Sequence, residues 1–343
     1  MTGVESLCRT LPEVGAEALT VAELGTEISR HLSRVVPHDG YMLVGLDPLS
    51  GAGCLHAKEH GYRTEVARLL ERADTFGLDV QPFAQLMTGP SQVGVTSVDS
   101  AESRHSIRVH EVMVSEGFCS EMRIALTARG IVWGALVLVR ELGRRSFSVA
   151  EETCAQRLVP AVAAAIERFV RAKALRPSRT ELPPGVLLVD ANDSITMATP
   201  SAHGWLAELT RHCAQVDGGE LHGIIWNITY LARRRAGPAL SRVPTPNGWV
   251  AVHAQPADTA PTANIAVTIQ PAPTALLLPA VATWYGLTAR EHSIVEQALD
   301  GLPANQIARR LQLSPHTVND HFKSIYRKIG VNSRDQLIAG ITA

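Results

Sequence analysis

The clearest periodic pattern of apolar positions along the chain lies between Ser314 and Gly330. Four apolar residues recur there at steps of four, three and four, which places them on one stripe of an α-helix: Val318, Phe322, Ile325 and Ile329. Ser314 is a favoured helix N-cap, Pro315 suits the first helical position, and Gly330 readily takes the left-handed conformation that ends a helix. The pattern therefore predicts a helix between these caps with one buried side.

The opposite side of this predicted helix is polar. It carries His316, Asn319, Asp320, Lys323, Ser324 and Arg327, with Thr317, His321 and Lys328 on one flank. Any surface helix needs a polar side, so this pattern alone allows a purely structural interpretation. The neighbouring sequence has to decide whether the polar side contacts a partner.

Three further helices are predicted around this one. Thr288 and Glu291 have the spacing of a capping box and begin a helix that ends before Gly301. The segment LPANQIARRLQLS then gives a second helix, and two residues separate it from the cap at Ser314. The capping-box spacing recurs after Gly330 and begins a fourth helix. Two helices joined as tightly as the second and third cross at a steep angle, which predicts a helix-turn-helix.

Ordered motifs between Leu287 and Ile341 carry a family resemblance. The stretch contains LT-x-RE, IA-x-x-L, S-x-x-TV-x-x-H, K-x-G-V and SR-x-x-L in this order. It resembles the four-helix DNA-binding domain of LuxR-type transcriptional regulators, although Pro303 stands where the family often has a Ser or Thr cap. The resemblance implies a transcriptional regulator whose partner is double-stranded DNA.

Position on the third helix, together with this resemblance, assigns roles to the polar side chains. Asn319, Asp320 and Lys323 are expected to face base edges, because their groups match adenine, the cytosine amine and guanine. Phosphate contacts are expected from Thr317, His321, Arg327 and Lys328. Residues 287–343 hold seven basic and five acidic side chains, a net charge of plus two. This modest charge predicts weak non-specific DNA binding and a homodimer.

The composition of the whole chain is that of an ordinary globular protein. Of 343 residues, 45% are hydrophobic and 19% are charged, with 32 basic against 33 acidic side chains. This predicts two or three domains without a global positive field. The N-terminus lacks a signal-peptide pattern and the longest apolar run, GIVWGALVLV, is too short to span a bilayer. A cytoplasmic protein with no membrane partner is therefore expected, with five widely spaced cysteines as free thiols.

Proline-rich segments at 171–185 and 270–286 are expected to be linkers that divide the chain into three parts. In the first, residues 1–172, a helical pattern leads to a strand-like YMLVGLD, further helical segments, a hairpin turned at Arg129 and Gly130, and a long final helix. This order resembles a GAF domain, an α/β sensor module. The resemblance implies a small-molecule ligand, whose identity the sequence does not give.

The long helix at the end of the GAF-like part has one mainly apolar side. That side carries Cys154, Leu158, Val162, Ala165, Ile166 and Phe169. It would pack either against a second copy of the chain or inside its own domain.

The middle part, residues 184–272, predicts an α+β domain. Two strands turned at Asn192 and Asp193 are followed by two helical segments and a pair of closing strands. This order resembles a PAS domain. The expected fold class is therefore multidomain: an α/β GAF-like sensor, an α+β PAS-like domain, and an all-α helix-turn-helix domain over 280–343.

One motif permits an enzymatic alternative. The segment HAKEH matches the H-x-x-E-H of zinc hydrolases, in which His56 and His60 would share a helix face and Glu59 would act as the base. Its glycine-rich surroundings leave room for about six helical residues, fewer than such a site needs. No catalytic or metal residue is assigned and no cofactor is expected. A further alternative is a sensor that acts mainly through protein partners.

Overall fold

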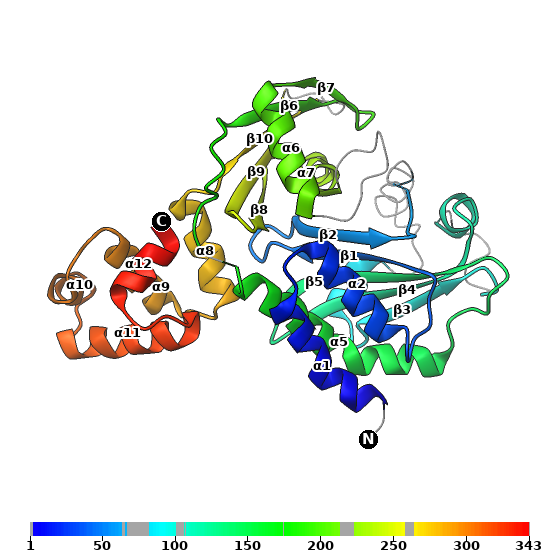
Figure 1. The fold of residues 1–343 in the computed structure, drawn as a ribbon, viewed down its shortest axis with the longest axis horizontal. Coiled ribbons are helices and arrows are strands. Elements are labelled where there is room, and N and C mark those ends of the chain that lie inside the picture. The colour runs from blue at the N-terminus through cyan, green and yellow to red at the C-terminus, as the bar shows by residue number, and fades with distance from the viewer. Residues whose placement is uncertain are drawn as a thin grey trace.

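The computed structural model describes residues 3–63, 66, 82–100, 106, 108–173, 175–212, 223–257 and 264–342. It has three parts: two antiparallel sheets, each accompanied by helices, and a helical C-terminal part at the left of Figure 1. The multidomain fold class predicted from the sequence is confirmed. None of the helices in the described ranges combines the length and apolarity that crossing a bilayer requires.

The N-terminal part is built on a five-stranded antiparallel sheet, here called sheet A. Its strands are β1 (Gly40–Leu46), β2 (Gly53–Glu59), β3 (Val93–Ser97), β4 (Phe118–Ala128) and β5 (Ile131–Glu141), in the order β2-β1-β5-β4-β3. The β4–β5 hairpin turns at Arg129 and Gly130, both with positive φ, as predicted. Helices α1 (Gly3–Glu17), α2 (Val21–Leu32) and α5 (Val149–Arg171) lie along one face of this sheet (Figure 1).

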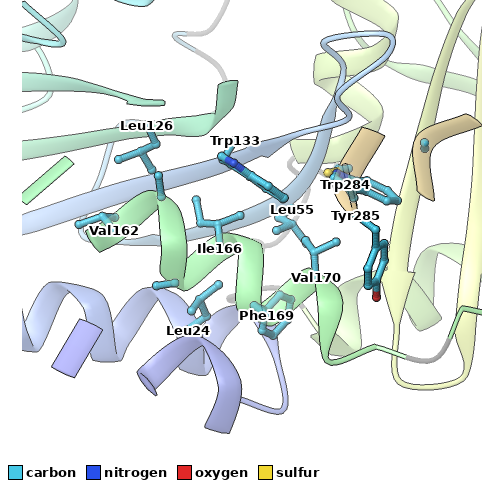
Figure 2. Packing of buried hydrophobic residues seen from close by; sticks show 14 of the residues in the cluster. Leu24, Leu55, Leu126, Trp133, Val162, Ile166, Phe169, Val170, Trp284 and Tyr285 are labelled. Atoms are coloured by element: carbon cyan, nitrogen blue, oxygen red, sulfur yellow. The ribbon is translucent and has the colours of Figure 1, made fainter. Parts of the chain in front are cut away.

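Helix α5 is the long helix expected at the end of the GAF-like part. Ser148 caps it in a capping box with Glu151. It packs so closely on α1 that a Cβ added to Gly15 would lie 1.9 Å from the carbonyl oxygen of Ala165. Figure 2 shows Ile166 of α5 beside Trp133 of sheet A, and Val162 nearer to Leu126. The buried residues of this helix include Leu158, Val162, Ala165, Ile166 and Phe169. Its apolar side therefore closes its own domain and is not available for a second copy.

A buried ion-pair network lies near the other face of sheet A. Glu121 of β4 contacts Arg123 Nε at 2.6 Å and Arg108 Nη2 at 2.9 Å, and it accepts a hydrogen bond from the Tyr62 hydroxyl. Arg108 belongs to a short π-helical segment, η3 (Arg108–Met113), and helix α4 (Phe83–Thr88) packs beside β4. Burial raises the pKa of Glu121, but the two arginines outweigh it and lower this pKa to about 2. The carboxylate therefore remains charged inside the protein.

The middle part repeats the strand order of the first. Sheet B consists of β6 (Gly185–Val189), β7 (Ile195–Ala198), β8 (Ala239–Thr245), β9 (Gly248–Pro256) and β10 (Ile265–Pro271), in the order β7-β6-β10-β9-β8. Helices α6 (Pro200–His212) and α7 (Gly223–Arg235) pack with it around one core. The predicted strands, helices and turn at Asp193 are present. Strand β8 was not predicted, because Pro238 precedes it and Pro244 interrupts its strand pattern.

Direct contacts join the two sheet-containing parts. Arg242 of β8 forms a buried ion pair with Asp47 at the end of β1, with Nη1 and Oδ2 2.7 Å apart. Asn227 of α7 accepts a hydrogen bond of 2.5 Å from the Gly53 backbone, and the Ser241 hydroxyl donates to the Gly53 carbonyl at 2.7 Å. The edge of sheet A at the start of β2 is therefore fixed against the middle part.

The segment expected to be a linker at 270–286 contains a helix. Residues Thr274–Trp284 form α8, and its Leu277, Val281 and Trp284 are buried. The expectation was wrong for these residues because Pro273 occupies the N-cap and Pro279 is tolerated inside the helix. Helix α8 leads into α9 (Ala289–Leu299), α10 (Ala304–Leu311), α11 (Pro315–Ile329) and α12 (Arg334–Thr342).

Candidate nucleic-acid interface

Helix α11, here called the reading helix, has the caps that the sequence predicts. Ser314 Oγ accepts a hydrogen bond of 3.0 Å from the Thr317 backbone, Pro315 occupies the first turn, and Gly330 ends the helix with φ of 81°. The predicted apolar stripe is buried: Val318, Phe322, Ile325 and Ile329. The stripe fixes which side of the helix faces outward, because it can only lie against the other helices of this part.

A tight turn sets the reading helix against α10. Gln312 takes the left-handed conformation with φ of 55°, and the Leu313 backbone N–H donates to the Ala308 carbonyl at 2.8 Å. Pro303 caps α10 without a side-chain hydrogen bond, which agrees with the missing Ser or Thr cap noted in the sequence. The pair α10–α11 is thus a helix-turn-helix of the predicted kind.

The outward side of the reading helix is open to solvent. Its exposed side chains are His316, Asn319, Asp320, Lys323 and Arg327. Asp320 lies between two of them, with Lys323 Nζ 3.0 Å from Oδ1 and His316 Nε2 3.4 Å from Oδ2. The hydrogen bond from Lys323 lowers the pKa of Asp320. Such exposed pairs add little stability, so a nucleic acid could replace them at little cost.

The remaining residues assigned from the sequence are less accessible. Thr317 and His321 are half-buried, and the Thr317 hydroxyl lies 2.8 Å from Ser314 Oγ. Lys328 places its ammonium 2.6 Å from Glu291 Oε2 and 2.9 Å from the Gly286 carbonyl. These two internal acceptors hold the reading helix against the start of α9, so the structure gives Lys328 a role inside the domain.

Two features of this C-terminal part were not predicted from the sequence. Arg334 donates through Nη2 to the carbonyls of Ala298 and Leu302, at 3.2 and 2.6 Å, and so ties α12 to the end of α9. Arg309 and Arg310 are exposed on α10, the helix that crosses the DNA backbone in a helix-turn-helix. The two consecutive arginines shortly before Ser314 could have indicated this second feature from the sequence.

The zinc-site geometry considered for HAKEH is not formed. His56 and Glu59 lie in strand β2, where His56 pairs with Val44 of β1. Four residues along an extended strand span roughly 13 Å, so His56 and His60 cannot share a metal as they would on a helix. His60 instead places Nε2 2.8 Å from Glu141 Oε1. Strand β2 was missed because the flanking glycines and charged residues conceal its alternation.

Helices α9, α10, α11 and α12, with one side of α11 exposed, give the C-terminal part a helix-turn-helix arrangement. Residues 286–340 match the family described as bacterial regulatory proteins, luxR family. HTH-type transcriptional regulators of Mycobacterium bovis and Mycobacterium tuberculosis are 42% identical to this chain over 55 residues. That match covers 16% of this chain and only 6% of the length of these relatives.

Among solved structures, SdiA of Escherichia coli is similar over 98% of this chain and 95% of its own, with 15% identity and a TM-score of 0.37. A phycoerythrobilin-bound GAF domain from a cyanobacterial phytochrome is similar over 49% of this chain and 96% of its own. Its identity to this chain is 16% and its TM-score is 0.33.

Proposed function

We propose that this protein is a DNA-binding transcriptional regulator controlled by a signal or partner that its two N-terminal sheet-containing parts receive. The observation that carries the proposal is the exposed polar side of the reading helix within a LuxR-family domain. We assign the reading of base edges to Asn319, Asp320 and Lys323, which are exposed on this side. A small molecule bound by the GAF-like part is the signal we favour. The domain division that we propose remains 1–172, 184–272 and 280–343, and α8 spans the boundary before the last domain.

Phosphate contacts are proposed for the rim of this surface. Arg327 is exposed at the end of the reading helix, and Thr317 and His321 are half-buried along its flank. We add Arg309 and Arg310 of α10 to this set, since their exposed guanidinium groups suit phosphate oxygens. Lys328 is left out because two internal acceptors hold its ammonium.

Selection from random duplex DNA by the full-length protein tests this function. We expect enrichment of one sequence motif, with affinity that falls as salt concentration rises. If the protein bound DNA but enriched no motif at any salt concentration, the proposal of a sequence-specific regulator would be contradicted. That result would favour the alternative of a sensor that acts through protein partners.

We further propose that the protein binds DNA as a homodimer. One reading helix offers a short contact, and two copies on half-sites about one helical turn apart would supply specific affinity. Helix α12 is the candidate contact, because Asp335, Gln336 and Ala339 are exposed on it and the buried side of α5 is excluded. Sedimentation of the full-length protein with and without a two-half-site duplex tests this. A monomer that occupies one half-site with full affinity would contradict it.

A further inference from the structure

Arg171, the last residue of α5, binds the end of α8 in two directions. Its Nε and Nη2 atoms donate to the Trp284 carbonyl at 3.1 and 2.5 Å, and its own carbonyl accepts from the Tyr285 hydroxyl at 3.1 Å. Its guanidinium also lies over the Tyr285 ring, 5.1 Å from the ring centroid. We call the contacts of Arg171 with Trp284 and Tyr285 the Arg171 clasp. Three contacts of different geometry fix both the distance and the angle between the two helix ends.

The surroundings of the clasp hold its members in place. Glu167, buried one turn earlier on α5, forms an ion pair with Arg171, with Oε1 2.8 Å from Nη2. The Trp284 ring packs on Trp249 of sheet B with centroids 4.6 Å apart, and Figure 2 shows Trp284 and Tyr285 beside Val170 of α5. Burial raises the pKa of Tyr285 to about 12. The phenol is therefore protonated at neutral pH and can donate its hydrogen bond.

The residue after the clasp is hydrogen-bonded to the reading helix. Gly286 follows Tyr285 with φ of 62°, a conformation that reverses the chain at the end of α8. Its carbonyl accepts the hydrogen bond of 2.9 Å from Lys328 of the reading helix. The residue that directly follows the clasp thus contacts α11. This connection is short and hydrogen-bonded at both ends, unlike a flexible linker.

The clasp does not cover the reading helix. His316 and Lys323 have side-chain exposures of 85% and 74%, so the reading surface is open while the clasp is formed. The clasp therefore orients the DNA-binding domain without blocking it. We propose that Arg171 is a positioning residue that sets the angle of the reading helix relative to α5, and thereby the half-site spacing that a dimer accepts. The proposal rests on the proposed function as a dimeric DNA-binding regulator.

Hydrogen–deuterium exchange of the full-length protein tests the clasp without DNA. Arg171→Ala should raise exchange of the backbone amides of 281–287 at least tenfold and leave α10 and α11 unchanged. Arg168→Ala is the matched control, because Arg168 is exposed three residues earlier on the same helix. Tyr285→Phe removes one hydroxyl and should also raise exchange of these amides, by a smaller factor. This variant provides the test if Arg171→Ala fails to fold. Unchanged exchange in both clasp variants would overturn the proposal.

DNA with two half-sites at varied spacing tests the consequence. Wild-type protein should bind one spacing about tenfold more tightly than a spacing changed by half a turn, and Arg171→Ala should lose that preference. Affinity for a single half-site should be unchanged, a result that damage to the DNA-binding domain itself would not give. A spacing preference retained by Arg171→Ala would overturn the proposal. Absence of specific DNA binding by wild-type protein would instead contradict the proposed function, and exchange would still decide the clasp.

Discussion

Lys328 of the reading helix and Glu291 of α9 form an ion pair in which Nζ and Oε2 are 2.6 Å apart. Glu291 is buried, and its carboxylate also accepts a hydrogen bond of 2.7 Å from the Thr288 backbone. One carboxylate thus fixes the start of α9 and the end of the reading helix together. Burial raises the pKa of Glu291, but its hydrogen bonds, first that from Lys328, lower this pKa from 4.5 to about 2.

This ion pair should make the stability of the DNA-binding domain depend on acid pH. Because the folded pKa is depressed, the stabilisation is complete above pH 4.5 and is lost as the pH falls toward 2. Lys328→Met should lower the free energy of unfolding by on the order of 2 kcal/mol at pH 7. The difference in unfolding free energy from wild type should narrow as the pH falls from 4.5 toward 2, as urea unfolding monitored by circular dichroism would measure. Lys323→Met, in an exposed pair, is the control; a difference that stays constant with pH would refute the assignment.

The Asp47–Arg242 pair should couple the unfolding of the two sheet-containing parts. Both side chains are buried, and Asp47 also accepts from the backbone amides of Leu49 and Ser50. Asp47→Asn leaves Arg242 as an uncompensated buried charge and should cost about 3 kcal/mol. We expect denaturant unfolding of this variant to separate into two transitions. Glu27→Gln, which removes an exposed pair with Arg30, should leave the curve nearly unchanged.

The close approach of α1 and α5 should make Gly15 intolerant of any side chain. A Cβ at this position would overlap the backbone of Ala165, which has no flexible atoms to move aside. Gly15→Ala should therefore lower the free energy of unfolding by about 2 kcal/mol or more. Gly3→Ala in the same helix would meet Val35 Cγ1 at an ordinary 3.5 Å and should be neutral or slightly stabilising. Equal stability of the two variants would show that α1 and α5 are not packed as described.

The helical C-terminal part could be predicted closely because its signals are local. Ser314, Thr288 and Gly330 each act within a few residues of the helix end that they fix. Strand β2 and helix α8 were not predicted. Glycines flank β2 and prolines lie at and within α8, so their local sequence does not favour these elements, which tertiary packing stabilises. The clasp joins Arg171 to Trp284 and Tyr285, which lie 113 and 114 positions further along the chain. No local sequence pattern predicts such a contact. Helix periodicity predicts which residues of the reading helix face outward, whereas the internal contacts of Lys328 required the structure.

Replacement of Lys323 should change which DNA sequences the protein prefers. Its side chain is 74% exposed and its ammonium is paired with Asp320. We propose that it donates to a guanine edge. Lys323→Ala should cost about 1 to 3 kcal/mol of binding free energy and relax preference at one operator position. Selection of sites from random DNA with the variant measures both effects. A binding motif identical to that of wild type would remove Lys323 from the base-reading set.

Replacement of Arg327 should weaken binding to all DNA sequences alike. Arg327 is exposed at the end of the reading helix, where a guanidinium group suits a phosphate oxygen more than a base edge. Each phosphate contact releases condensed counterions, so Arg327→Ala should reduce the slope of log affinity against log salt by about one. Titrations of the selected operator and of unrelated duplex DNA at several salt concentrations measure that slope. Arg168→Ala removes an exposed arginine from α5 and should leave it unchanged. If Arg327→Ala altered the sequence motif while keeping the wild-type salt slope, Arg327 would have to be reassigned to base reading.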